Sequence, residues 1–118
     1  MIPKFRAYNP ATNDWYKPEE VFVSDGNIYL DDDDFDELTQ NNDVTLMQST
    51  GLLDVNGKEI FEGDVVRMHS GELLPVRLHH GMFEPVCYYV SSVFEKVGNI
   101  FENPELTEHP DFREATND

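Results

Sequence analysis

Short apolar runs alternate with turn-forming residues along most of the chain, a pattern typical of β-strands joined by tight turns. The clearest signal is Ser24-Asp25-Gly26, which separates Val21–Val23 from Asn27–Leu30. Asp-Gly between two apolar runs predicts a hairpin, because glycine adopts a positive φ at little cost. Three further strands are predicted in this half, at Phe5–Tyr8, around Trp15-Tyr16 and at Val44–Gln48. The first half of the chain therefore reads as a small β meander.

Two turns lie close together within the stretch Gln48–Val66. In Asp54-Val55-Asn56-Gly57, the Asp54 carboxylate is suited to accept backbone hydrogen bonds, and Asn56 and Gly57 tolerate a left-handed φ. Gly63-Asp64 forms the second turn, and Ile60 and Phe61 between the turns are expected to be apolar anchors. A strand with alternating faces is predicted next, at Val65–His69. The stretch indicates a compact corner that leads into a barrel strand.

Later strands are predicted at Leu73–His79 and in the aromatic-rich run Met82–Val90. Leu74, Val76 and Leu78 alternate in the first, and Pro75 indicates an edge position or a bulge. Gly81 begins the turn between the two runs.

The last strand is predicted at Val93–Phe101, with a bulge at Gly98-Asn99. Asn103-Pro104-Glu105-Leu106 has an N-cap residue, a proline at the first helical position and an acid in the first turn, so a brief helical turn is expected. The polar segment His109–Asp118 is expected to fray.

Charge is the unusual property of this composition: 24 acidic and 8 basic residues give a net charge of −16 over 118 residues. Residues 14–43 hold eleven acids and one lysine, a net −10, whereas residues 44–101 hold seven acids and four bases, a net −3. So acidic a chain repels nucleic-acid phosphates and anionic membranes, and favours basic proteins or cations as partners. Its length suits one compact domain or two small lobes.

The acidity is concentrated in the run Asp31–Asp43. An exposed turn and one or two turns of helix, capped by Asp33 or Asp34, are equally consistent with it. The run does not match an EF-hand calcium loop, because no alignment of the loop on this run supplies the required glycine at position six and glutamate at position twelve. The residues of this run that we consider as a partner-binding segment are Asp31, Asp32, Asp33, Asp34, Asp36 and Glu37.

Cys87 is the only cysteine, so an internal disulfide is excluded, and its strand-like setting favours a buried structural thiol. We find no apolar run long enough to cross a membrane, and the first residues lack the apolar core of a signal peptide. These features predict a reducing cytoplasm as the location.

The chain resembles the YopX family, small proteins encoded by phages and prophages of Gram-positive bacteria. The resemblance spans nearly the whole chain, and the acidic run Asp31–Glu37 is not part of it. It rests on Lys4-Phe5-Arg6-Ala7, Thr50-Gly51-Leu52, Asp54, Asn56-Gly57-Lys58-Glu59-Ile60, Glu62-Gly63-Asp64-Val65-Val66, Gly98-Asn99-Ile100 and Asn103-Pro104-Glu105-Leu106. It implies a mostly β protein whose C-terminal half is similar to an SH3-like barrel, a phage or prophage origin and intracellular expression. It brings no activity and no catalytic residues.

Motifs for catalysis or cofactor binding are missing from the sequence. The serines lack a nucleophile elbow, and no glycine-rich phosphate loop precedes a helix. A zinc site needs three or four nitrogen or sulfur ligands, and His79 and His80 point to opposite faces of a strand, so they cannot readily share one metal. Glu72 or Glu84 could join one of them, but surface or turn positions are expected for the four histidines, His69, His79, His80 and His109. We therefore expect no enzyme, no cofactor and no metal site. The aromatic residues are mostly expected in the core, although Tyr88 or Tyr89 can be exposed for a partner.

The predicted architecture is mostly β with short helical turns: an N-terminal β meander with an acidic loop (1–50) packed on an SH3-like barrel half (51–106), with a polar tail (107–118). The function that fits best is a non-enzymatic interaction module acting in the bacterial host cytoplasm, with a host or phage protein as partner and neither nucleic acid nor membrane. One alternative is an acidic nucleic-acid mimic that blocks a DNA-binding protein. A second is a small metal-dependent enzyme, and self-association is also open.

Overall fold

The chain is mostly β in a computed structural model, which describes residues 4–31, 38–79, 81–84 and 94–113. Two compact units divide it, Met1–Gln48 (unit 1) and Ser49–Asp118 (unit 2). The only helical segments among the described residues are two short 3-10 helices, η1 (Pro18–Glu20) and η4 (Pro104–Glu108). No helix in this described part is long and apolar enough to cross a membrane.

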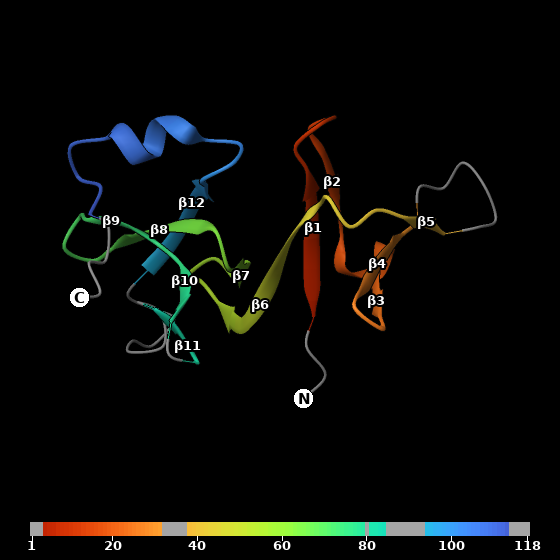
Figure 1. Ribbon diagram of the computed structural model, residues 1–118. Helices are drawn as coiled ribbons and strands as arrows, with labels where there is room; N and C mark the ends of the chain where they lie inside the picture. The colour runs from red at the N-terminus through yellow and green to blue at the C-terminus, as the bar shows by residue number, and fades with distance from the viewer. Residues whose placement is uncertain (1–3, 32–37, 80, 85–93, 114–118) are drawn as a thin grey trace. The chain divides into compact units, whose positions relative to one another are not determined.

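Unit 1 contains two antiparallel sheets (Figure 1). In the first, β1 (Phe5–Asn9) lies between β2 (Asp14–Tyr16) and the first half of β6 (Thr45–Leu53). In the second, β4 (Asn27–Leu30) lies between β3 (Val21–Ser24) and β5 (Thr39–Gln40). The strands predicted at Phe5–Tyr8, Trp15-Tyr16, Val21–Val23 and Asn27–Leu30 are thus confirmed, whereas β5 was not predicted.

The β3–β4 hairpin forms as the Asp-Gly signal predicted. Asp25 and Gly26 form the turn with φ values of 51° and 79°, and Ser24 pairs with Asn27 on either side of it. Two successive positive φ values match the twist of the flanking strands. The core of unit 1 lies beside this hairpin and consists of Ala7, Leu30 and Val44, with Tyr16, Val21, Ile28 and Leu46 packed against them.

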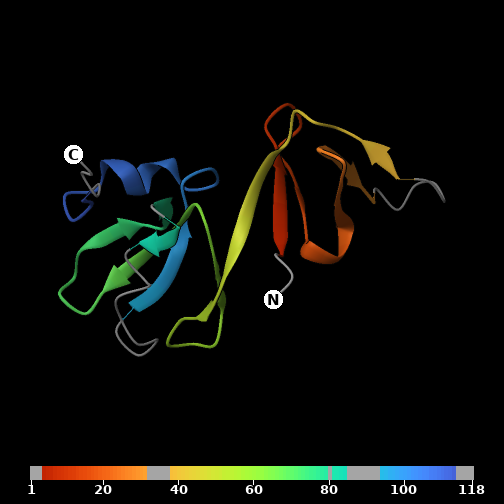
Figure 2. The ribbon, with the colours of Figure 1, turned by 60° about the horizontal axis from the view of Figure 1, so that its bottom comes forward.

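Unit 2 begins within β6, whose second half pairs with β7 (Glu59–Phe61). A three-stranded antiparallel sheet follows, in which β8 (Asp64–Met68) lies between β12 (Phe94–Asn99) and β9 (Leu73–Pro75). The hairpin β10 (Arg77–His79) to β11 (Met82–Glu84) turns at Gly81, as predicted (Figures 1 and 2). Because these strands form separate small sheets over the described residues, the SH3-like barrel stays a prediction.

The core of unit 2 is centred on β8. It contains Ile60, Val66, Met68, Val76 and Phe94, with Leu74 and Phe83 packed against it. Val65 and Val66 are both fully buried. Because neighbouring residues of a strand point to opposite faces, both faces of β8 are covered at these two positions.

The predicted strand Leu73–His79 is divided at Val76. The Val76 N–H donates to the Asp64 carbonyl (2.8 Å), and its carbonyl accepts from the Gly63 N–H (2.8 Å). The expected common face fails in consequence, since Val76 is buried while Leu78 is exposed. Pro75 lies in β9 at the edge of the β12-β8-β9 sheet, as predicted.

The end of the described chain is bound more firmly than its composition indicates. The predicted helical turn is present as η4, but Asn103 makes no side-chain capping bond. Residues 109–113 do not fray, because the Leu73 N–H donates to the Asp111 carbonyl and the Arg113 N–H donates to the Leu73 carbonyl, both at 2.8 Å. This backbone pairing overturns the expectation of a loose tail over these residues.

Candidate functional site

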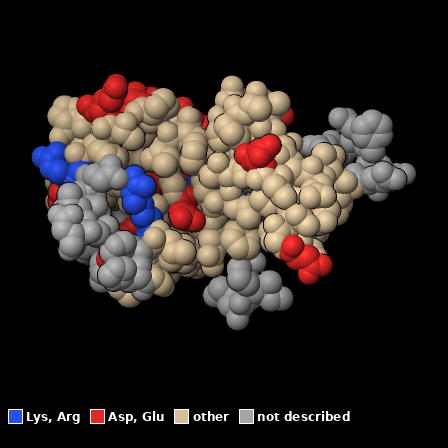
Figure 3. Space-filling view, in the orientation of Figure 1, with Lys and Arg blue, Asp and Glu red and all other residues tan. Residues whose placement is uncertain are grey.

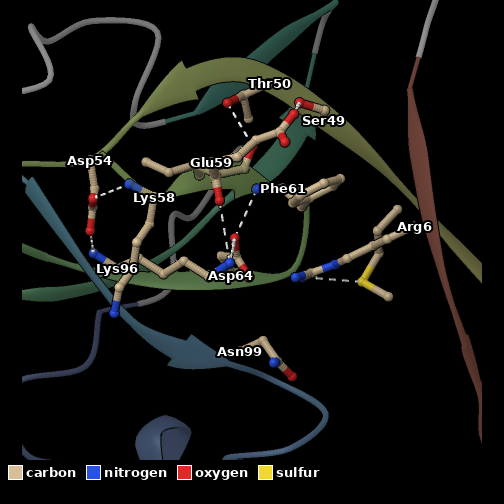
Figure 4. A network of polar contacts seen from close by, with 12 residues as sticks. Arg6, Ser49, Thr50, Asp54, Lys58, Glu59, Phe61, Asp64, Lys96 and Asn99 are labelled. Carbon is tan, nitrogen blue, oxygen red and sulfur yellow. Dashed lines mark hydrogen bonds and ion pairs between the residues drawn. The ribbon is translucent and has the colours of Figure 1, made fainter. Parts of the chain in front are cut away.

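The later blocks of the family resemblance, from Asp54 onward, meet in unit 2, where the two turns around β7 contact β12 (Figure 4). The site contains two buried carboxylates, Asp54 and Asp64, which are 3% and 0% exposed. Lys96 lies between them on β12, and Asn99 lies at the end of that strand.

Asp54 joins the first turn to β12 through both of its carboxylate oxygens. Its Oδ1 accepts from the backbone N–H groups of Asn56 (2.9 Å) and Lys58 (2.8 Å). Its Oδ2 accepts from the backbone N–H of Lys96 at 2.8 Å. The prediction that Asp54 accepts backbone hydrogen bonds is confirmed, and the link to Lys96 lies 42 residues away in sequence.

The environment of Asp54 favours its charged form. Burial raises the pKa of this carboxyl, but the backbone N–H groups of Lys96, Lys58 and Asn56, together with the Lys58 charge, outweigh burial and hold the pKa below its ordinary value of 3.8. A carboxylate that accepts several backbone N–H groups is stabilised as the anion. Asp54 is therefore a charged structural link.

Asp64 organises the second turn in a similar way. Its Oδ2 accepts from the Phe61 N–H at 2.8 Å and lies 3.2 Å from the Lys96 ammonium nitrogen. The same ammonium donates to the Glu59 carbonyl at 3.3 Å and lies 5.8 Å from the centre of the Phe61 ring. Lys96 thus compensates the buried charge of Asp64 and ties β7 to β12.

The last part of the motif forms a third turn after β12. Asn99 is 5% exposed, and its Oδ1 accepts from the N–H groups of Phe101 (3.0 Å) and Glu102 (2.8 Å). Asn99 also pairs with Asp64 across the sheet, which joins the last motif block to the G-D-V-V block. The predicted bulge lies one residue earlier than expected, between Lys96 and Gly98, because Gly98 pairs with Val65.

Gly98 is closely packed against η4 and its N-cap residue. A Cβ atom there would lie 2.4 Å from the Asn103 Oδ1 and 2.9 Å from the Leu106 Cδ1. Such distances are shorter than real Cβ contacts, so any larger residue would force the Asn103 and Leu106 side chains to move. The Gly98 and Asn103 positions of the motif are therefore linked by direct contact.

Two hydroxyls and a carboxylate where β6 pairs with β7 complete the network. The Ser49 hydroxyl lies 2.5 Å from Glu59 Oε2 and accepts from the Gly51 N–H, while the Thr50 hydroxyl donates to the Ile60 carbonyl. These contacts hold the irregular part of the β6–β7 pairing, where the register shifts between Ser49 and Leu53. Chemically, the arrangement orients backbone turns, and its polar atoms are directed at the chain itself.

The predicted partner-binding segment is only partly described. Asp31 follows β4, is half-buried, and donates its N–H to the Glu20 carbonyl at 2.9 Å. Asp32, Asp33, Asp34, Asp36 and Glu37 lie outside the described residues, as do Cys87, Tyr88 and Tyr89. The structure therefore leaves the role of this segment as a prediction.

Over the ranges that the structure describes, no group of three or more His, Cys, Asp or Glu side chains is placed to hold a metal ion. His109 lies beside Asp111, with 3.7 Å between its Nδ1 and Asp111 Oδ2, and accepts from the Asp111 N–H at 3.1 Å. Arg67 lies 3.6 Å from the same carboxylate. This cluster attaches the tail to the β8–β9 sheet.

Sequence reasoning missed Lys96, which serves both buried carboxylates. One signal was available, because Lys96 is the single basic residue between Arg77 and Arg113. It also missed the surface apolar side chains. The large apolar side chains exposed among the described residues are Phe22, Val23, Leu38, Leu52, Leu53, Val55, Leu78, Met82 and Val97.

Fold and site together define a small, mostly β protein whose motif residues stabilise turns and strand contacts. The sequence profile described as YopX protein matches residues 4–108, and the chain belongs to this family. A similar solved structure is the crystal structure of protein EF1440 from Enterococcus faecalis, with 25% sequence identity, a TM-score of 0.65, and coverage of 90% of this chain and 98% of that chain. The comparison with curated proteins gave no match.

Proposed function

We propose that the protein is a non-enzymatic interaction module that binds another protein, of the phage or of its bacterial host, in the host cytoplasm. The observation that carries the proposal is the contrast between the motif and the surface. The motif residues Asp54, Asp64 and Asn99 are engaged inside unit 2, whereas large apolar side chains are exposed in both units.

The hydrogen bonds of the motif carboxylates within their own chain support a structural role for the motif. Asp54 accepts three backbone N–H groups, and Asp64 accepts one and faces Lys96. A general base must reach a proton on a substrate, and these carboxylates are directed at their own chain. Their fixed geometry supports a role in presenting a stable surface.

The exposed apolar side chains supply candidate contacts. In unit 2, Leu52, Leu53 and Val55 lie within four positions of the sequence and are 37%, 50% and 48% exposed. In unit 1, Phe22 and Val23 are 46% and 48% exposed on β3. Apolar groups left in water favour partner binding, because their burial releases free energy of about 25 cal/mol per Å².

Quantitative affinity capture from a phage-infected Gram-positive host lysate tests the proposal. The wild type is compared with a Leu53→Lys variant and with an acid-neutralised variant in which the Asp residues of 31–37 become Asn and Glu37 becomes Gln. A partner retained at several salt concentrations and lost with either variant supports an interaction module. Recovery of no partner above background at any salt concentration contradicts it.

The nucleic-acid mimic stays an alternative prediction. It requires carboxylates spaced along one surface like phosphates, roughly 7 Å apart along a strand. The densest acidic residues, 32–37, lie outside the described chain, so the acid-neutralised variant is its test too. A captured DNA-binding protein that is released by this variant and displaced by DNA would favour the mimic.

A further inference from the structure

The strand β3 has an open edge. It lies at one side of the β3-β4-β5 sheet and pairs only with β4 over the described residues. Natural edge strands are usually protected by a charge, a proline or a bulge. Val21–Ser24 contains neither a charged residue nor a proline, and its pairing with β4 is regular.

The register identifies which backbone groups face outward. Ser24 and Asn27 flank a two-residue turn and are the hydrogen-bonded pair, so Phe22 and Tyr29 form the next such pair. Val23 then directs its N–H and carbonyl away from β4. Its partner Ile28 agrees, because the Ile28 N–H donates to Asn42 Oδ1 and its carbonyl accepts from the Asn41 N–H, on the β5 side.

Val21 shares the outward direction, but its N–H is already used. It donates to the carbonyl of Pro18, the first residue of η1. The open edge therefore offers the Val23 donor and acceptor and the Val21 carbonyl, the set that a short added strand would use.

The side chains at this edge are apolar and accessible. Phe22 and Val23 are 46% and 48% exposed and point to opposite faces of the sheet. Phe22 lies across from Tyr29, which is half-buried. An added strand would thus gain contacts on both faces.

Acidic groups surround the strand. Glu19 and Glu20 precede it, Asp25 lies in its turn, and Asp31 is bound through its N–H to Glu20; Lys17 is the one nearby base in sequence. The face of unit 1 visible in Figure 3 is otherwise largely uncharged, with acidic groups at separate points. A second copy of this chain would bring equal negative charges together, whereas a basic segment would be attracted.

We infer that the open edge of β3 binds an extended, lysine- or arginine-flanked segment of a partner protein, which adds as a strand next to Val21–Ser24. This inference rests on the proposed interaction function and names its binding surface. Backbone hydrogen bonds with Val23 supply affinity, Phe22 and Val23 supply apolar contact, and the flanking acids select basic ends.

A labelled nine-residue peptide tests it, with two lysines at each end and alternating valine and threonine between them. Fluorescence anisotropy is expected to detect binding, and N-methylation of the five central residues is expected to weaken it at least about tenfold. Exchanging the lysines for glutamates is expected to have a similar effect. Bound peptide is expected to slow hydrogen exchange of the Val23 amide and to leave the Phe22 amide, which faces β4, unchanged.

Protein variants supply matched controls. Val23→Lys is expected to weaken binding at least about tenfold, whereas Thr39→Lys, which adds the same charge on β5 in the same unit, is expected to stay within about twofold. Val23→Pro removes the outward N–H without removing a bond to β4. Trp15 fluorescence reports whether unit 1 of each variant is folded.

Four outcomes would overturn the inference: no binding at about 1 mM peptide, insensitivity to N-methylation, equal affinity of the two lysine variants, or a dimer that Val23→Lys dissociates. If Val23→Lys captures the same lysate partner as the wild type, binding at the β3 edge is refuted, while the proposal that the protein is an interaction module stands. If the peptide binds at Val23 but no lysate partner is captured, binding at the β3 edge stands and the proposed function fails.

Discussion

Replacing Asp54 by asparagine is the most direct test of the view that the motif is structural. Asparagine keeps the size of the side chain and one acceptor oxygen, which can still serve Asn56 and Lys58. Its amide group then faces the Lys96 N–H, so two donors oppose each other where the wild type has a 2.8 Å bond. Hydrogen bonds to a charged group contribute about 1.5–3 kcal/mol each, and an unsatisfied buried donor costs about 1–3 kcal/mol. We expect Asp54→Asn to lower the free energy of unfolding by about 2–4 kcal/mol at pH 7, against a total of about 5–15 kcal/mol for a typical domain.

The pH dependence supplies a second signature. The folded pKa of Asp54 lies below 3.8, its ordinary value. Its contribution to stability is therefore complete above this pH, and is lost as the pH falls from 3.8 through the folded pKa, because the unfolded chain takes up the proton first. The free energy of unfolding is expected to change by at most about 1.4 kcal/mol per pH unit through this one group. The Asp54→Asn variant has no titrating carboxyl at this position. The difference in unfolding free energy between the wild type and the variant is therefore expected to become smaller as the pH falls through this acidic range.

Urea unfolding at pH 7 and at several acidic values measures both effects. Far-UV circular dichroism follows the whole chain, and NMR signals of the Val65 and Val66 amides follow unit 2. Glu108→Gln is the control, since it removes one negative charge from an exposed residue of η4. A loss below about 0.5 kcal/mol, or a difference from the wild type that stays constant through the acidic range, would refute the structural role of Asp54.

Three further predictions concern the same unit. Lys96→Met leaves the buried Asp64 carboxylate without its ammonium partner and is expected to destabilise by about 2–3 kcal/mol in urea unfolding, and an unchanged midpoint would contradict the role of this pair. Gly98→Ala places a methyl group 2.4 Å from Asn103 Oδ1, so a loss of about 1–3 kcal/mol and shifted NMR signals from η4 are expected; a wild-type spectrum would show that η4 adapts freely. Removing residues 109–118 is expected to speed hydrogen exchange of the Leu73 amide about tenfold or more, because that amide loses its Asp111 acceptor; unchanged exchange would mean that the tail pairing is not formed in solution.

Local signals in the sequence predicted the turns and most of the strands well. Asp25-Gly26 and Asp54-Val55-Asn56-Gly57 act within a few residues, where backbone preferences decide the conformation. The predictions that failed depend on distant contacts. Leu78 is exposed because the predicted strand is interrupted at Val76, whose backbone bonds to Gly63 and Asp64. Residues 109–113 are ordered because Asp111 and Arg113 form backbone hydrogen bonds with Leu73.

In the candidate site, too, local contacts were predictable from the sequence and distant contacts were not. That Asp54 would accept backbone hydrogen bonds followed from its turn, but that Lys96 would donate one of them did not, because the two residues lie 42 positions apart. The exposure of Phe22 and Val23 could not be predicted either, because an apolar run predicts a strand but does not show whether other residues cover it.

By itself, the sequence determined the family, the mostly β character, the positions of the tight turns and the acidic balance, because these depend on composition and on neighbours along the chain. The tertiary structure alone decided which motif residues meet, which carboxylates are buried and compensated, and which edge strand is left open. The reason is physical: burial and strand pairing are set by residues far apart in sequence, and their contacts exist only once the chain is folded.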